Sequence, residues 1–228
     1  MKTYGQYCPI AKAVEVLGER WSLLVLRELL IGSTRFNDIA RGLPGMSRTM
    51  LSKRLREFEA AGLLERLDGE YLLTPSAHEM RPIVFGLGAW GERWLLGEPD
   101  PADLDPVTLM WHAHARFDTS VLPDRRVVIA FERDVRSERF WVVVEEIGCS
   151  VCEADPGFDV DVVVRARLAD LYRIFYHQLP IEGAVKSGAV RFEGESALVR
   201  RMPQVLDLLS PDLLGVDADA PRPVWRAP

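Results

Sequence analysis

The sequence predicts an α+β fold in two parts, an N-terminal helix-turn-helix completed by a β-hairpin and a C-terminal small mixed α/β sheet. Two observations carry this prediction. Residues 33–74 read as a short helix, a tight turn, a capped helix and a two-stranded hairpin. Beyond residue 106 the pattern changes to short apolar runs separated by polar turns, which is typical of a sheet.

Composition and charge bound the class of protein. The chain has 228 residues and a net charge of −6, and 48% of the residues are hydrophobic, which suffices for two cores. Its three cysteines indicate no disulfide framework and favour a reducing compartment. We find no signal peptide and no apolar run of the roughly 20 residues that a membrane span needs. The expectation is a soluble, cytoplasmic protein without a membrane partner.

Residues 9–31 are predicted to form two helices separated by Gly18. The second is assigned to helix rather than strand because charged residues and strong helix formers interrupt its apolar run. We expect the following residues to pack beneath the helix-turn-helix: Val14, Leu17, Trp21 and Leu24.

The helix-turn-helix follows. Its first helix has apolar residues at helical spacing: Phe36, Ile39 and Leu43. The second helix begins after a Pro-Gly-Met turn with Ser47 as N-cap and ends at Gly62. The predicted buried face of this helix carries Leu51, Leu55 and Phe58.

The opposite face of the second helix carries donors suited to phosphates and base edges: Thr49, Ser52, Lys53 and Arg56. Between residues 35 and 56, six Lys or Arg stand against a single acid. Such a basic stretch in an acidic chain favours nucleic-acid binding, because neutralised phosphates release counterions. A solvated face of an ordinary domain is the alternative, but the order of elements favours a winged helix whose second helix enters the major groove. The candidate DNA-binding residues are Arg35, Ser47, Arg48, Thr49, Ser52, Lys53, Arg54, Arg56 and Arg66, with phosphate contacts assigned to Arg35, Arg48 and Arg54.

Asp68-Gly69 between apolar strands predicts the hairpin, or wing. Thr74-Pro75 then starts a long helix. Its apolar residues recur three and four apart: Met80, Ile83, Val84, Leu87, Trp90, Trp94 and Leu95. Packing within the monomer is one reading of this stripe. We prefer a dimerisation helix, because a two-fold dimer matches palindromic DNA half-sites.

Four segments are predicted along the chain: a DNA-binding and dimerisation domain at residues 1–97, a linker at 98–106, a second domain at 107–210 and a mobile tail at 211–228. The second domain should begin with a short helix over 107–117. Strands are expected at 127–131, 140–145, 150–153 and 160–165, arranged as an antiparallel meander. A helix over 168–179, a Gly-containing loop, a strand at 190–193 and a helix over 196–209 should complete it.

Signatures of catalysis are missing from the sequence. There is no nucleophile elbow, P-loop or dinucleotide-binding motif, so we expect neither an enzyme nor a cofactor. Cys149 and Cys152 form a C-x-x-C, but residues three apart in a strand point to opposite faces. A zinc site would also need two further ligands, and no metal is expected.

Residues 7–96 resemble the HxlR family of bacterial winged-helix transcription regulators. The resemblance rests on YCPIAKAVEVLGERWSLLVLRELLIG, RFNDIARGLPGMSRTMLSKRLREFEAAGLLER, YLLTPSA and LGAWGERW. It implies a homodimer, built from the first helices and the long helix after the wing, that binds pseudo-palindromic double-stranded promoter DNA. Family members usually carry a longer, basic wing. Here Arg66 is the only basic wing residue, between Glu65 and Glu70, which argues against a minor-groove contact by the wing.

Residues 106–210 resemble the sterol-carrier-protein-like fold, through RFWVVVEE, FDVDVVVRARLADLYRIF and LPIEGAVKSGAVRFEGESALVRRMPQVL. This resemblance implies an apolar pocket for a small hydrophobic ligand. Trp141, Phe175 and Tyr176 are the candidates to line it, with core packing as the alternative role of each.

The favoured hypothesis is a homodimeric transcription regulator controlled by a hydrophobic effector in its C-terminal domain. The first alternative is a redox- or electrophile-sensing regulator. In several members of the HxlR-like family a cysteine at the place of Cys8 senses oxidants, and a helix N-terminus beside a thiol favours the thiolate. The second alternative is a hydrophobic-ligand carrier that binds no DNA.

Overall fold

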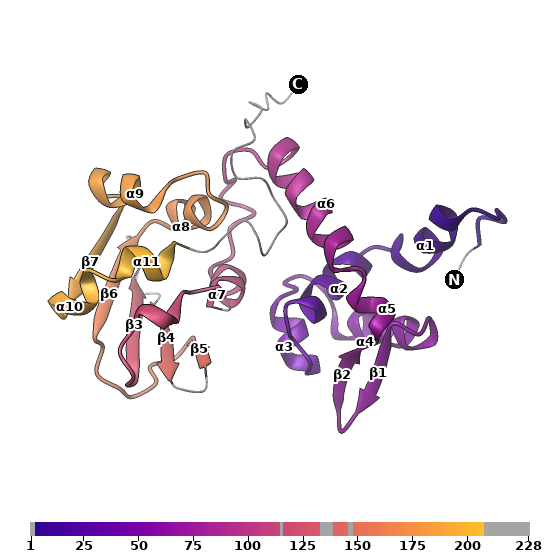
Figure 1. Ribbon diagram of the computed structural model, residues 1–228, viewed down its shortest axis with the longest axis horizontal. Helices are drawn as coiled ribbons and strands as arrows, with labels where there is room; N and C mark the ends of the chain where they lie inside the picture. Colours follow the sequence, from indigo (N-terminus) through magenta and orange to yellow (C-terminus); the bar gives the residue numbers. More distant parts are fainter. Residues whose placement is uncertain (1–2, 115, 133–138, 146–147, 208–228) are drawn as a thin grey trace. The chain divides into compact units, whose positions relative to one another are not determined.

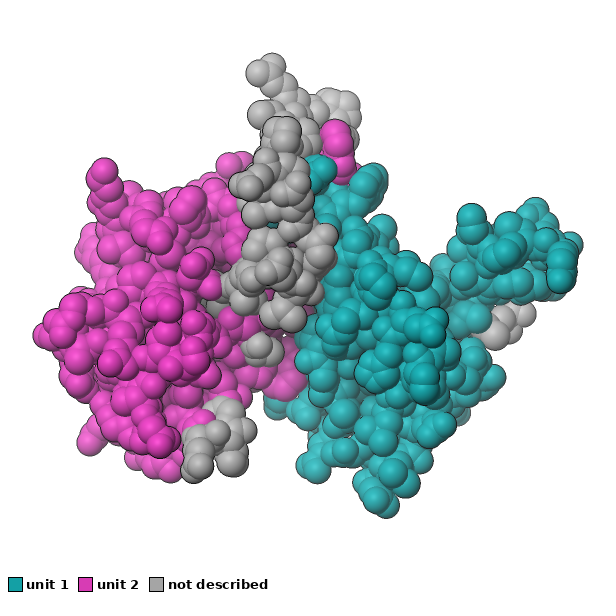
Figure 2. Space-filling view, in the orientation of Figure 1, with its two compact units in different colours: residues 1–93, 214–222 teal, residues 94–213, 223–228 magenta. Residues whose placement is uncertain are grey.

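The computed structural model describes residues 3–114, 116–132, 139–145 and 148–207. These residues fall into two compact units that divide between Arg93 and Trp94 (Figure 2). The predicted boundaries of the linker and of the second domain stay predictions, and the predicted tail lies outside the described residues.

The first unit is a winged helix-turn-helix, as predicted (Figure 1). Its helices and strands are α1 (Pro9–Leu17), α2 (Ser22–Leu30), α3 (Phe36–Arg41), α4 (Arg48–Ala60), β1 (Leu64–Leu67), β2 (Glu70–Leu73), α5 (Pro75–His78) and α6 (Arg81–Trp94). The helix expected to begin at Thr74 is divided into α5 and α6. Thr74 does cap α5, since its hydroxyl accepts a hydrogen bond from the backbone N–H of Ala77.

Local sequence fixes the start and the buried face of α4. The Ser47 hydroxyl accepts a 3.2 Å hydrogen bond from the backbone N–H of Met50, which satisfies a donor that the helix itself leaves unpaired. Leu51, Leu55 and Phe58 are at most 1% exposed and pack with α2 and α3. The capping residue and the apolar face predicted for this helix are both confirmed.

The wing is a two-stranded antiparallel hairpin that projects from the helices (Figure 1). Asp68 and Gly69 both have positive φ, 51° and 85°, as a two-residue turn matching the twist of the strands requires. The backbone N–H of Tyr71 donates a 2.8 Å hydrogen bond to the carbonyl oxygen of Thr34. This bond ties β2 to the segment that leads into α3.

The core of the first unit lies between α2, α3, α4 and the base of the wing. Val25, Leu26 and Leu30 of α2 are at most 2% exposed. The prediction that Val14 and Leu24 are buried is wrong: they are exposed by 37% and 41%. Helix α1 has no fully buried residue, but Val16 and Leu17 at its C-terminal end are half-buried against this core.

The second unit is a five-stranded mixed sheet with helices. Its elements are α7 (Pro106–His114), a 3₁₀ turn η1 (Thr119–Val121), β3 (Val127–Glu132), β4 (Arg139–Glu145), β5 (Gly148–Cys152), β6 (Val162–Ala166), α8 (Leu168–Phe175), α9 (Ile181–Ser187), β7 (Val190–Gly194), α10 (Ser196–Val199) and α11 (Met202–Leu206). The strand order is β5-β4-β3-β6-β7. The predicted mixed sheet is confirmed.

The predicted antiparallel meander is only half right. Strands β3, β4 and β5 form it, but β6 crosses to the other edge of β3 and pairs with it in parallel, Ile129 opposite Val162. Because β4 occupies one edge of β3, the other edge is available to a later strand. Residues 127–131 of β3 are all buried, as expected for a strand covered on both faces.

Two helical predictions in the second unit also need correction. The loop expected before β7 contains the helix α9, which ends at Gly188 in the left-handed conformation, φ 77°. The closing helix is broken into α10 and α11, with Pro203 in the first turn of α11, where a missing N–H costs little. The last residues predicted for that helix, 208 and 209, lie outside the described residues.

Candidate nucleic-acid interface

Helix α4 presents a polar, basic face opposite its buried face. Thr49, Lys53 and Arg56 are exposed, and Ser52 is half-buried. Lys53 Nζ lies 3.9 Å from Glu57, and the Nε of Arg56 donates to the carbonyl oxygen of Ser52 at 3.3 Å. Such exposed contacts on one helix are weak, so both side chains can exchange them for a phosphate at little cost.

Arg48, the first residue of α4, is also exposed, and two side chains of α3 hold it. Its Nη2 donates a 2.8 Å hydrogen bond to Oδ1 of Asn37, and its Cζ lies 4.8 Å from the centre of the Phe36 ring. Sequence reasoning missed both supporting residues. Phe36 and Asn37 lie on the helix that precedes α4. That position in the sequence is a signal that could have pointed to their contacts with Arg48.

Arg54 corrects the predicted interface. It is 4% exposed, and its guanidinium donates to Glu57 of its own helix and, at 3.1 Å, to Glu19 between α1 and α2. In this arrangement Arg54 faces the protein and joins α4 to the α1–α2 connection. On the helical wheel Arg54 falls only 40° from Phe58, beside the apolar stripe, because the two are four positions apart. The helical wheel therefore already placed Arg54 beside the buried face of α4.

The remaining basic candidates lie at the wing. The Nε of Arg35 donates to Glu70 of β2 at 3.0 Å, while the Arg35 side chain stays 73% exposed. Arg66 of β1 lies over the Tyr71 ring, 5.6 Å from its centre. The Glu70 carboxylate neutralises part of the positive charge of Arg35.

A partly buried ion pair on α2 supports the turn between α3 and α4. Glu28 of α2 is fully buried and accepts two hydrogen bonds from Arg27, at 2.8 Å and 2.6 Å. Arg27 also donates to the carbonyl oxygen of Gly42 at 3.0 Å. Sequence reasoning used these two charges only to choose helix over strand and did not predict their pairing.

Helix α6 leaves most of its apolar stripe exposed. Val84 is buried at 8% exposure, whereas Ile83, Leu87, Trp90 and Trp94 are between 45% and 60% exposed. Two exposed tryptophans on one helix are unusual for a surface that stays in water.

Comparison with known proteins matches the same part of the chain. Residues 16–99 match the family model described as HxlR-like helix-turn-helix. The uncharacterized HTH-type transcriptional regulator YvaP of Bacillus subtilis (strain 168) is 36% identical over 109 residues, which are 44% of this chain and 97% of YvaP. The chain belongs to the HxlR family. It is a DNA-binding transcriptional regulator of the HxlR type.

Two further similarities involve the same region. The HTH-type regulator sll1512 of Synechocystis sp. is 37% identical over 98 residues, covering 40% of this chain and 73% of sll1512. The solved structure of quinone-bound YodB from B. subtilis is 32% identical, with a TM-score of 0.36, and the match covers 38% of this chain and all of YodB. The curated relatives named here are regulators, consistent with a protein that is not an enzyme.

In this HxlR-type regulator the three cysteines are free thiols. Cys8 is the N-cap residue of α1 and is half-buried. On β5, Cys149 packs against the main core of the second unit and Cys152 against the opposite face of the sheet. Burial raises the pKa of Cys149 to about 12. The opposite orientation predicted for the C-x-x-C pair is confirmed.

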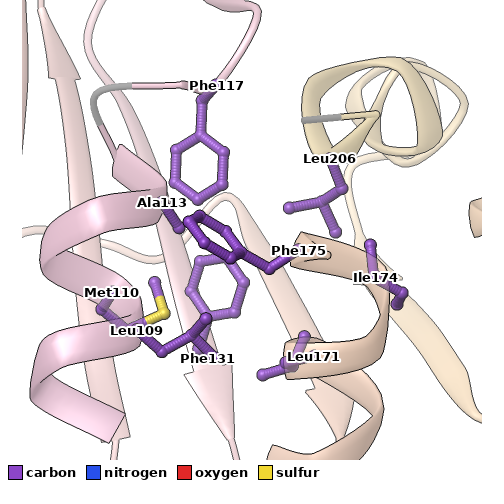
Figure 3. A pocket seen from close by; sticks show the side chains of 9 residues that line it. All are labelled: Leu109, Met110, Ala113, Phe117, Phe131, Leu171, Ile174, Phe175 and Leu206. Atoms are coloured by element: carbon purple, nitrogen blue, oxygen red, sulfur yellow. The ribbon is translucent and has the colours of Figure 1, made fainter. Parts of the chain in front are cut away.

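The second unit contains a small apolar cavity between α7, α8, α11 and β3 (Figure 3). Its lining consists of Leu109, Met110, Ala113, Phe117, Phe131, Leu171, Ile174, Phe175 and Leu206. Its volume of about 20 Å³ is room for about one water molecule. Of the three predicted lining residues only Phe175 lines it. Tyr176 packs against the neighbouring core, and Trp141 lies on the other face of the sheet with Val128 and Ala130.

Within the described residues, no three His, Cys, Asp or Glu side chains gather as a metal site would require. Among the same residues, no helix is long and apolar enough to cross a membrane.

Proposed function

We propose that this regulator binds promoter DNA as a homodimer and places the exposed face of α4 in the major groove. The observation that supports the proposal best is the basic, solvent-facing side of α4, with Thr49, Lys53 and Arg56 opposite a fully buried apolar side. The chain as a whole carries a net charge of −6, so this local excess of positive charge selects the surface that DNA can approach.

The homodimer is proposed from α6 and α1. The exposed apolar residues of α6, together with Tyr7 and Ile10 next to and on α1, which are also exposed, form surfaces that a second copy of the chain can cover. A two-fold dimer presents two α4 helices to two half-sites of a pseudo-palindrome. This is the assembly that the family resemblance implies.

The test is binding of the purified protein to a fluorescent fragment of its own upstream DNA, with unrelated DNA of equal length as control. We expect tighter binding to the upstream fragment at both of two salt concentrations, with a steep loss of affinity as salt rises. Equal, weak binding to both fragments at both salt concentrations would count against the proposal for this promoter.

We further propose that a small hydrophobic effector enters the second unit at its apolar cavity. The lining side chains are all apolar and come from three helices, one strand and the loop after α7, and the sterol-carrier-like resemblance implies such a ligand. Drug-sized ligands occupy about 300–1,000 Å³, so an effector has to separate α7, α8 and α11. Titration with a long-chain fatty acid should raise the unfolding temperature, and the variant Ala113→Leu, which fills the cavity, should abolish that rise.

Redox sensing through Cys8 is the second candidate. It is supported by the half-buried thiol at the N-terminus of α1, a helix that belongs to the proposed dimer surface. An oxidant should weaken DNA binding of the wild type and leave Cys8→Ser unaffected. The same loss in both proteins would exclude Cys8 as the sensor. The third hypothesis, a carrier that binds no DNA, is wrong because the chain is a DNA-binding regulator.

A further inference from the structure

Arg48 differs from the other exposed basic residues of the interface in how it is held. It is the first residue of α4, directly after the capping Ser47. In helix-turn-helix proteins the N-terminal residues of the second helix are the ones that contact base edges. Its position in α4 therefore places Arg48 among the residues that can contact base edges of the DNA.

Two contacts from α3 fix the guanidinium of Arg48. The Phe36 ring lies against its face, with 4.8 Å from Cζ to the ring centre, and Asn37 Oδ1 accepts from Nη2 at 2.8 Å. Phe36 is itself packed against the core of the first unit. A side chain held in this way loses less conformational entropy when it binds than one that moves freely.

The two contacts leave one pair of N–H donors of the guanidinium available to bind a guanine. A guanidinium has two edges with a parallel pair of N–H donors, one formed by Nε and Nη2 and the other by Nη1 and Nη2. A single hydrogen bond from Nη2 occupies one edge, and the stacked ring occupies a face. The other edge has no hydrogen-bond acceptor among the residues that the structure describes.

Among the described residues, no second helix supports the neighbouring Lys53 and Arg56. Lys53 is 3.9 Å from Glu57 on its own helix, and Arg56 donates to the Ser52 carbonyl of its own helix. Attraction to a phosphate does not need a fixed plane, because a mobile point charge suffices, whereas a bidentate contact to a base depends on planar alignment.

We propose that Arg48 is a specificity-determining residue that donates two hydrogen bonds to O6 and N7 of a guanine in each half-site, and that Asn37 and Phe36 position it. This assignment rests on the proposed placement of α4 in the major groove. It replaces the phosphate contact predicted for Arg48 from sequence. A correct bidentate pair gives roughly 5- to 150-fold discrimination against another base.

The test is selection of binding sites from randomised double-stranded DNA by the full-length wild type, Arg48→Ala, Asn37→Ala and Arg35→Ala. We expect the wild type to select a guanine at one position of each half-site and Arg48→Ala to select any base there. Asn37→Ala should keep the guanine with weaker preference. Arg35→Ala, the control for a phosphate contact, should bind all sequences more weakly and keep the wild-type preference.

A second measurement uses the selected site with 7-deazaguanine at that position, which removes the N7 acceptor. The wild type should lose affinity by roughly fivefold or more, and Arg48→Ala should bind both DNAs equally. The proposal is overturned if Arg48→Ala retains the guanine preference and its affinity for all sequences falls by the same factor, as loss of a phosphate contact predicts. Failure of the proposed function looks different, because the wild type would then select no sequence.

Discussion

At the scale of single residues, Gly42 is required by the buried carboxylate beside it. A Cβ at this position would lie 1.9 Å from Oε2 of Glu28, and Glu28 is fully buried. We expect Gly42→Ala to lower the free energy of unfolding of the first unit by about 1–3 kcal/mol through overpacking.

The matched control for this substitution is Gly88→Ala on α6, where a Cβ meets nothing within 4 Å. There the change should stabilise the protein by about 0.5–1 kcal/mol, since alanine favours a helix over glycine. Urea unfolding of both variants measures the difference. Equal stability of the two would show that Glu28 moves aside freely.

Arg54 and Lys53 are adjacent in sequence, and we predict opposite effects of replacing them. Arg54 is 4% exposed and joined to Glu19 and Glu57, whereas Lys53 is 57% exposed. Arg54→Ala should lower stability by about 1–3 kcal/mol, because hydrogen bonds to a charged group are lost. Lys53→Ala should leave stability within about 0.5 kcal/mol and weaken DNA binding. Thermal unfolding and DNA titration of both variants measure these effects. A loss of stability in Lys53→Ala and a loss of DNA affinity without a loss of stability in Arg54→Ala would contradict the roles given to the two residues.

At the scale of elements, α8 connects the apolar cavity with the segment before α7. Leu171, Ile174 and Phe175 line the cavity. The Tyr172 hydroxyl donates to the carbonyl oxygen of Asp105 at 2.9 Å and accepts from the Asp105 backbone N–H at 3.2 Å. A ligand that displaces α8 would therefore also displace the residues that lead from α6.

This tyrosine predicts a pH dependence. Burial is the main cause that raises the pKa of Tyr172 from 10.0 to about 12. Between these values the folded state keeps a proton that the unfolded state has lost, so stability is complete below about pH 10 and falls as the pH rises towards 12. Tyr172→Phe should remove this part of the alkaline loss, measured by urea unfolding of both proteins from pH 8 to pH 11. An identical decline in the variant would show that Tyr172 does not contribute.

Local sequence signals predicted some elements well because their causes are local. The Ser47 cap, the apolar face of α4 and the Asp68-Gly69 turn each depend on a few consecutive residues. The pairing of β6 with β3 depends on which sheet edge is still free, which no local pattern encodes. The candidate nucleic-acid interface was likewise predicted only where it depends on local sequence. The exposed face of α4 follows from helical periodicity, whereas the burial of Arg54 and the support of Arg48 by Asn37 depend on contacts between helices.

At the scale of the whole molecule, the exposed apolar residues of α6 predict the oligomeric state. We expect the wild type to have twice the chain mass of 25.7 kDa in sedimentation, and Leu87→Glu, which places a charge on the exposed stripe, to have the mass of one chain. Leu67→Glu on the wing is the matched control, because Leu67 is 60% exposed, similar to the 51% of Leu87, but lies off α6. A single-chain mass for the wild type would contradict the dimer.

The most direct test of the central claim, that the exposed face of α4 binds DNA, is the salt dependence of binding by the double variant Lys53→Ala, Arg56→Ala. Its control is Lys186→Ala, Arg191→Ala, which removes the same charge from exposed positions of the second unit. We predict that the slope of log affinity against log salt falls by about 2 in the α4 variant, one for each lost phosphate contact, and is unchanged in the control. Wild-type affinity and slope in the α4 variant would contradict the claim.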